Sequence, residues 1–95
     1  MKKAIIYVRG NKQEQQEILC RLYAVEYDVL FATTNLEDAY NCDCDVVIVA
    51  NASRISRDIF EYHRTIKALK SKGIKIEFAT HNANNNISLQ MDITP

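Results

Sequence analysis

Three arginines that follow two apolar segments are the residues of this sequence best suited to chemistry. Arg9 comes directly after the apolar residues 4–8, and Arg54 and Arg57 come shortly after the apolar residues 46–49. A guanidinium group presents a planar fork of N–H donors that matches the oxygens of a phosphate group. Clustered guanidinium groups repel one another unless an anion compensates their charge. The pattern therefore predicts a phosphate or phosphodiester site where these side chains meet.

The two apolar segments predict the strands that carry these arginines. Residues 46–49 are four consecutive β-branched residues, which are too few for a helix and apolar on both faces. Residues 4–8 are a similar run with basic residues at both ends. Strands that are buried on both faces are typical of the middle of a parallel sheet. We therefore expect these two strands at the centre.

Segments with helical periodicity follow both strands. Residues 11–14 resemble a capping box, with Asn11 as the cap of a helix over residues 12–24. A second long helix is predicted over residues 56–70, with Gly73 as its stop signal. The apolar residues expected on the buried face of the first helix are Ile18, Leu19, Leu22, Tyr23 and Val25. Those expected on the buried stripe of the second are Ile59, Phe60, His63, Ile66 and Leu69.

Two further strands complete the pattern. Residues 27–32 are rich in strand formers, and the connection over residues 35–44 has room for barely more than one helical turn. Residues 74–79 alternate apolar and charged side chains, which predicts a half-exposed edge strand. With right-handed crossovers, this order predicts a three-layer α/β domain with a four-stranded parallel sheet in the order 2-1-3-4.

The strand order decides whether the arginines meet. In an open parallel sheet the ligand crevice lies beyond the strand C-termini where the strand order reverses, here between strands one and three. Because neighbouring strands are about 4.8 Å apart, Arg9, Arg54 and Arg57 can share one small volume. The helix that starts near Asn11 would point its free N–H groups the same way.

Other interpretations of these residues are weaker. Each arginine could pair with a surface carboxylate such as Glu14, Asp58 or Glu61, where ion pairs contribute little to stability. With only two glycines, the sequence has neither a P-loop nor a dinucleotide-binding fingerprint. A phospho-acceptor domain would need an aspartate at the end of the third strand, where Ala50 and Asn51 stand.

Composition bounds the remaining function classes. The 95 residues are 47% hydrophobic and 25% charged, which fits one globular domain with one core. The formal net charge is zero, so only a local cluster can attract nucleic acid. No apolar run approaches the roughly 20 residues of a membrane span, and the start is too short for a signal peptide. We expect a cytoplasmic protein without a membrane partner, with a domain over residues 1–80 and a polar, poorly structured tail over residues 81–95.

Metal and cofactor chemistry is not indicated. Cys42 and Cys44 form a C-x-C pair that lacks the second pair of a zinc knuckle. His63 and His81 lie far from the cysteines in the sequence. We expect Cys20 to be a small buried side chain on a helix, and we expect neither a metal nor a cofactor.

The sequence resembles the N-terminal catalytic domain of the serine recombinases, the resolvase/invertase family, over residues 3–80. One motif is Tyr7-Val8-Arg9 followed by a helix, which is a degenerate form of the family pattern. The more specific motif is S-R-I-S-R-D over residues 53–58, with a strand before it and a helix and strand after it. The resemblance implies a resolvase-like fold.

The resemblance also implies roles for individual residues. Arg9, Arg54 and Arg57 match arginines that hold the scissile phosphate in the family, and Tyr7 matches the family's tyrosine. Gln15 matches a glutamine in the family's first helix.

The sequence departs from the family pattern at the position of the nucleophile. Asn11 stands where the family has its nucleophilic serine, and a carboxamide forms no useful phosphoester. Ser53 replaces the aspartate that opens the second motif. The connection over residues 35–44 is too short to supply the family's arginine-bearing segment, and we expect neither the long dimerisation helix nor a C-terminal DNA-binding domain. The resemblance therefore implies a retained fold with no catalytic residue.

Three functions remain open at this point. The first is a catalytically degenerate resolvase-like domain that binds the DNA phosphate backbone, or associates with a protein partner or itself. The second is an active site-specific DNA recombinase that uses an unusual nucleophile, Ser53 or Ser56. The third is a scaffold domain without a ligand.

Overall fold

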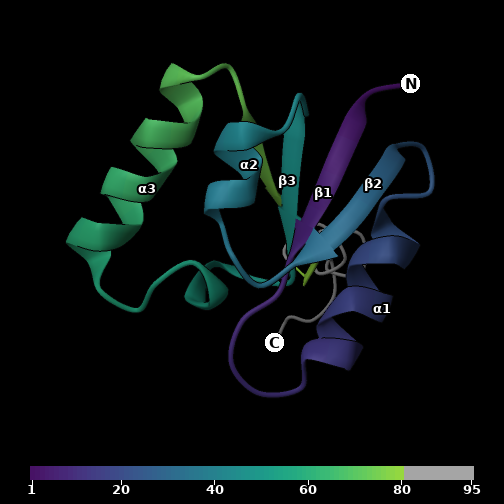
Figure 1. The fold of residues 1–95 in the computed structure, drawn as a ribbon. Helices are drawn as coiled ribbons and strands as arrows, with labels where there is room; N and C mark the ends of the chain where they lie inside the picture. Colours follow the sequence, from purple (N-terminus) through teal and green to yellow (C-terminus); the bar gives the residue numbers. More distant parts are fainter. Residues whose placement is uncertain (81–95) are drawn as a thin grey trace, which may run out of the picture.

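A computed structural model of the chain describes residues 1–80. These residues form a four-stranded parallel sheet in the order β2-β1-β3-β4, which confirms the predicted topology (Figure 1). The strands are β1 (Lys3–Tyr7), β2 (Asp28–Thr33), β3 (Val46–Val49) and β4 (Lys75–Phe78). The tail expected over residues 81–95 lies outside the described residues.

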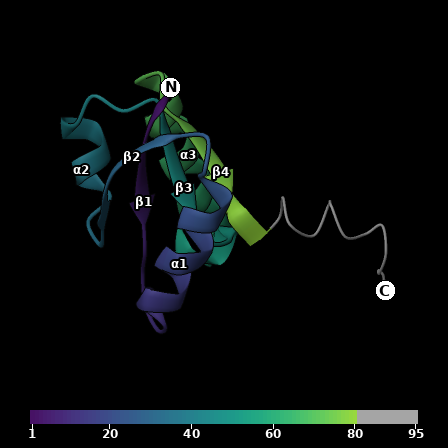
Figure 2. The same cartoon turned by 90° about the vertical axis from the view of Figure 1, so that its right-hand side faces the viewer.

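Helices cover both faces of the sheet, so the domain has three layers. The helices are α1 (Gln13–Tyr23), α2 (Glu37–Asn41), the short 3₁₀ helix η1 (Ala52–Arg54) and α3 (Ile59–Ser71). Figure 2 shows α1 and α2 on opposite sides of β1. The helix α1 packs on one core cluster, whereas α2 and α3 contribute to the other.

Alternation along the two central strands explains why both of their faces are apolar. Ile6 and Ile48 pack toward α1, whereas Ile5 and Val47 pack toward α2 and α3. All four are fully buried. Because these strands have no solvent-facing side, their sequences are continuous apolar runs, as predicted.

The buried face of α1 differs from the predicted one. Leu19 and Tyr23 are half-buried as expected, but Ile18, Leu22 and Val25 are 54%, 69% and 72% exposed. The residues that face the sheet are instead Gln16, Cys20 and Ala24. Their spacing of four places small side chains along one line, which lets the helix backbone lie close to the strands.

The predicted capping box is also wrong. The helix α1 begins at Gln13 after Lys12, whose φ of 60° is left-handed, and no side chain caps its N-terminus. Asn11 therefore does not act as the cap. The helix starts one residue later than expected because Lys12 has a left-handed rather than a helical backbone conformation.

The helix α3 begins later than predicted, at Ile59 rather than Ser56. The Asp58 carboxylate caps it by accepting a hydrogen bond from the Phe60 N–H at 3.0 Å. Ile59 and Phe60 are 63% and 77% exposed, so the predicted buried stripe is wrong at this end of the helix. His63 on the same stripe is exposed as well.

The stripe is correct in the second half of α3. Leu69 is fully buried and Ile66 is half-buried. The half-buried Tyr62, which stacks on Phe78 of β4, replaces the first residues of the predicted stripe. The helix stops before Gly73, which has a φ of 78°, as predicted.

The edge strand β4 is fixed to α1 by a carboxylate. Tyr23 and Tyr27 donate hydrogen bonds from their hydroxyl groups to Oε1 of Glu77 at 2.6 and 2.8 Å. Partial burial and then the bond to Glu77 raise the pKa of Tyr27 to about 12 and raise the pKa of Tyr23 above its ordinary value. The folded state therefore favours the neutral, protonated form of both tyrosines.

The corrected helix faces give a first prediction. Leu69→Ala should lower the free energy of unfolding by about 2–5 kcal/mol, because it leaves a cavity in a fully buried position. The control Leu22→Ala, on the exposed side of α1, should change it by no more than about 0.5 kcal/mol. Urea unfolding measures both values, and a larger loss for Leu22→Ala would contradict the observed faces.

The tyrosine contacts give a second prediction. The pKa of Tyr27 is raised in the folded state from 10.0 to about 12, so its stabilising contribution is complete below pH 10 and is lost as the pH rises to about 12. Urea unfolding across this range should show a falling free energy of unfolding. The fall should be smaller in Tyr27→Phe, which lacks the titrating group, and an equal fall in both proteins would count against the contact.

Candidate functional site

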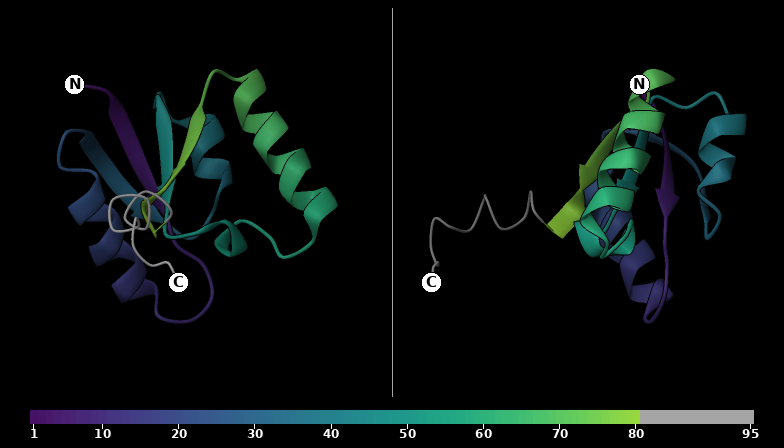
Figure 3. Two further views of the ribbon diagram at one scale, coloured as in Figure 1. Left: turned by 180° about the vertical axis from the view of Figure 1, so that it is seen from behind. Right: turned by 90° about the vertical axis from the view of Figure 1, so that its left-hand side faces the viewer.

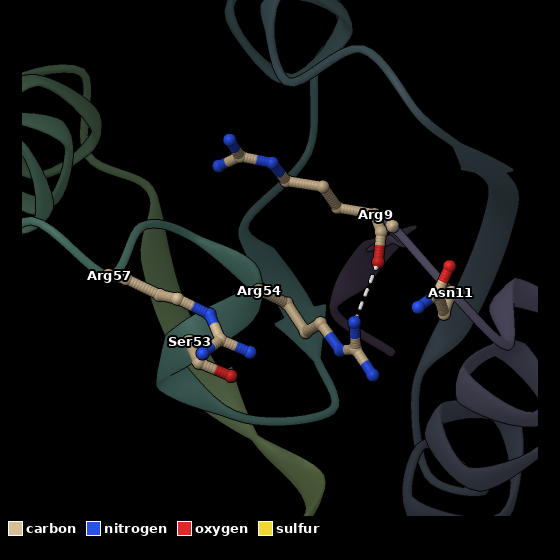
Figure 4. A pocket seen from close by; sticks show the side chains of 6 residues that line it. Arg9, Asn11, Ser53, Arg54 and Arg57 are labelled. Atoms are coloured by element: carbon tan, nitrogen blue, oxygen red, sulfur yellow. Dashed lines mark hydrogen bonds between the residues drawn. The ribbon is translucent and has the colours of Figure 1, made fainter.

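The C-terminal ends of β1 and β3 open into a pocket of about 320 Å³ (Figure 4). The residues that line it are Arg9, Gly10, Asn11, Ser53, Arg54 and Arg57. Both views of Figure 3 show η1 and the loop after β1 at the same end of the sheet. All three arginines line this pocket, but only the guanidinium groups of Arg54 and Arg57 point toward it, because the Arg9 side chain turns away.

Two hydrogen bonds tie the loop after β1 to the loop after β3. Nη1 of Arg54 donates to the carbonyl oxygen of Arg9 at 3.1 Å, and Nη1 of Arg9 donates to the carbonyl oxygen of Ile55 at 2.6 Å. The loops can reach each other because β1 and β3 are adjacent, with Ile6 paired to Ile48. Figure 4 shows the Arg54 guanidinium pointing toward Arg9 and Asn11, whereas the Arg9 side chain extends away from Asn11.

Gly10 makes this approach possible. Its φ of 76° is in the left-handed region, which favours glycine. A Cβ atom at this position would also lie 3.2 Å from Nη1 of Arg54. Any larger residue would therefore strain the backbone and displace the Arg54 guanidinium.

The positive charge of the pocket has no counterion within residues 1–80. The only ion pair in this part of the chain joins Arg21 to Glu17 at 2.8 Å on the surface. The alternative in which Glu14, Asp58 or Glu61 neutralises the arginines is therefore wrong for the described residues.

Other contacts engage two of these carboxylates. Asp58 caps α3, and Oε1 of Glu61 accepts a hydrogen bond from the Ser56 hydroxyl at 3.1 Å. Nε of Arg54 is buried without a hydrogen-bond partner in the same part of the chain. A buried donor without a partner is costly, so this arginine is held in place at an energetic expense. A bound anion would compensate the charge of its guanidinium group.

A buried glutamine that the sequence analysis missed holds the pocket loop. Gln16 is only 4% exposed. Its Oε1 accepts a hydrogen bond from the Arg9 N–H at 3.1 Å, and its Nε2 donates to the carbonyl oxygens of Arg9 and Asn11 at 2.8 and 2.7 Å. Gln15, to which the family resemblance assigned a role, is exposed. The spacing of four that joins Gln16 to the small residues Cys20 and Ala24 is the signal that could have identified it.

The other residues singled out from the sequence lie in different surroundings. Tyr7 is 7% exposed, belongs to the core cluster on the α2 and α3 face, and does not line the pocket. Ser53 lines the pocket, and its hydroxyl donates to Oδ1 of Asn51 at 2.5 Å. Ser56 does not line the pocket, and its hydroxyl contacts Glu61 and the Asp58 N–H.

The pocket is suited to binding an anion rather than to proton transfer. None of its six lining residues is a carboxylate or a histidine. The Ser53 hydroxyl therefore has no general base among them, which an attacking oxygen needs. The guanidinium groups of Arg54 and Arg57 provide the N–H donors and the electrostatic attraction.

Cysteine and histidine side chains form no second site in the described part of the chain. Within residues 1–80, no group of three or more His, Cys, Asp and Glu side chains could hold a metal ion. Burial raises the pKa of the Cys20 and Cys44 thiols to about 11, so both favour the neutral form. Within the same residues, every helix is too short or too polar to cross a lipid bilayer.

Comparisons with known proteins agree with this architecture. Residues 4–93 match the family described as "Resolvase, N terminal domain". No curated protein matches the sequence. The fold is similar to the crystal structure of the C-terminal catalytic domain of ISC1926 TnpA, an IS607-like serine recombinase, with a TM-score of 0.68 and 20% sequence identity. That similarity covers 81% of this chain and 67% of the other, and at this identity it establishes the fold alone.

The buried glutamine gives a prediction with a matched control. Gln16→Leu should lower the free energy of unfolding by about 1–3 kcal/mol, because it leaves backbone groups of Arg9 and Asn11 without partners. Gln15→Leu changes the neighbouring exposed side chain in the same way and should have an effect below about 0.5 kcal/mol. Urea unfolding distinguishes them, and equal effects would show that Gln16 does not hold the loop.

Proposed function

The chain belongs to the resolvase N-terminal domain family of the serine recombinases, and we propose that it is a non-catalytic member that binds a phosphate of the DNA backbone. The observation that carries this proposal is the group of three arginines around one pocket with no carboxylate to neutralise them within residues 1–80. The ligand that fits is a phosphate or phosphodiester group.

The geometry supports a phosphate in preference to other ligands. Arg54 is oriented by its bond to the Arg9 carbonyl oxygen, so part of its guanidinium fork remains available to a ligand. Arg57 lines the same pocket and makes no hydrogen bond to any residue in the described range. Two guanidinium groups at one small pocket match the several acceptor oxygens of a phosphate.

The absence of a suitable nucleophile supports the non-catalytic part of the proposal. By family resemblance, Asn11 occupies the position of the nucleophilic serine, and its side chain lines the pocket without a reactive hydroxyl. Loss of the hydroxyl removes the covalent phosphoester on which serine catalysis depends. Arginines that bind phosphate do not need that hydroxyl, so binding can persist without the reaction.

An active recombinase is the second candidate because Ser53 lines the pocket. Its hydroxyl would have to exchange the hydrogen bond to Asn51 for a general base, and no other pocket-lining residue supplies one. We therefore favour binding over cleavage.

Phosphate binding can be tested with Arg57→Gln. Inorganic phosphate at about 100 times its dissociation constant should stabilise the parent protein by about 2.7 kcal/mol, because it binds only the folded state. Arg57→Gln removes a charged donor and should weaken binding by roughly 10- to 100-fold without lowering the unliganded stability, because it also removes one of the like charges of the cluster. Thermal unfolding with and without phosphate measures both effects, and Arg21→Gln is the control because Arg21 pairs with Glu17.

Two results would contradict the proposal. Equal stability with and without phosphate would remove the binding site. A covalent protein–DNA adduct on a recombination-site DNA, seen on a denaturing gel and lost in Ser53→Ala, would show that the protein is catalytic.

A further inference from the structure

The positive charge of this neutral protein is concentrated in one segment. Residues 54–76 contain seven basic and two acidic residues, which gives a charge of +5, and the rest of the chain therefore carries −5. Both acidic residues, Asp58 and Glu61, are engaged at the start of α3 by the Phe60 N–H and the Ser56 hydroxyl. Residues 62–76 contain no acidic residue at all. A polyanion is the ligand that complements such a segment.

The outer side of α3 carries an exposed aromatic residue in line with two of these basic residues. Phe60, Arg64 and Lys67 are spaced by four and three, so they lie on one side of the helix. Leu69, nine residues after Phe60, faces the core from the opposite side. Phe60 is 77% exposed, and Arg64 and Lys67 are exposed as well. We call these three residues the α3 ridge.

The α3 ridge begins a short distance along the chain from the arginine pocket. Arg57 lines the pocket and comes only three residues before Phe60, a span of at most about 11 Å along the chain. From Phe60 to Lys67 the helix adds about 10 Å. Figure 1 shows α3 on the flank of the domain, with its N-terminal end connected to η1. The α3 ridge has no ion pair within residues 1–80.

We propose that the α3 ridge extends the pocket into a binding track for single-stranded nucleic acid. This inference rests on the proposed phosphate function of the pocket. Phosphates follow Arg57, Arg64 and Lys67, and an unpaired base stacks on the Phe60 ring. Exposed aromatic rings beside basic residues bind single strands in this way, whereas the bases of a duplex are already stacked on one another.

A protein partner is the competing occupant of this surface. Ile59 is also exposed, at 63%, but it lies about one quarter of a turn away from Phe60 and outside the line of Arg64 and Lys67. An apolar docking site would use both Ile59 and Phe60, whereas a stacking site uses only the Phe60 ring. Substituting Ile59 and Phe60 separately therefore distinguishes a protein partner from a nucleic acid.

The test measures fluorescence anisotropy of a labelled oligothymidine and of the corresponding duplex with the full chain. The single strand should bind more tightly than the duplex. Phe60→Ala should weaken single-strand binding by roughly 5- to 150-fold, whereas Phe60→Tyr should retain it and Ile59→Ala should match the parent protein. Lys67→Gln should weaken binding and reduce the slope of log affinity against log salt by about 0.7.

The outcomes separate this inference from the phosphate function of the pocket. If Arg57→Gln abolishes oligonucleotide binding and Phe60→Ala does not change it, the pocket function stands and the α3 ridge inference is overturned. Duplex binding as tight as single-strand binding overturns it as well. Equal losses in Ile59→Ala and Phe60→Ala would indicate an apolar docking surface and overturn the stacking role. If phosphate does not stabilise the protein but Phe60→Ala still weakens oligonucleotide binding, the pocket function fails. The extension of the pocket is then overturned with it, although the α3 ridge itself binds single strands.

Discussion

The hydrogen bond from Arg54 to the carbonyl oxygen of Arg9 joins the ends of the two central strands, and the geometry of the pocket depends on it. It forms because β1 and β3 are neighbours and because Gly10 has no side chain to block the guanidinium. On the other side, Gln16 fixes the backbone of the same loop with three hydrogen bonds. The fixed loop in turn holds the Arg54 guanidinium at the pocket, which reduces the entropy cost of binding a small anion.

The net charge of the molecule is zero, but its positive and negative residues are unevenly distributed. The chain has equal numbers of basic and acidic residues, yet the pocket and α3 carry the excess of positive charge. Like charges held together without a counterion destabilise a fold. A cluster of this kind is expected at a binding site, where the ligand supplies the missing charge. A cluster of positive charge without a counterion agrees with a resolvase-family domain that keeps phosphate-binding arginines. By the family resemblance, Asn11 stands at the position of the nucleophile in this domain.

The sheet and the shared place of the arginine-bearing loops could be predicted from the sequence, whereas the direction of the Arg9 side chain and the helix faces could not. Continuous β-branched runs such as residues 46–49 are local signals of a central strand, and topology rules then fix the strand order. The faces of α1 and α3 depend on contacts that local periodicity does not contain. Cys20 faces the sheet in preference to the larger Leu22 because a small side chain lets the helix pack closely. Gln16 is buried because its side chain is hydrogen-bonded to backbone groups of a loop. A hydrophobicity pattern contains no information about such partners.

The most direct measurement of the central claim is a crystal structure of the protein grown with sulfate, which has the shape and charge of a phosphate group. The account predicts a tetrahedral anion in the pocket, within hydrogen-bond distance of the guanidinium groups of Arg54 and Arg57. A pocket without an anion, with the Arg57 side chain turned into solvent or paired with a carboxylate, would contradict it.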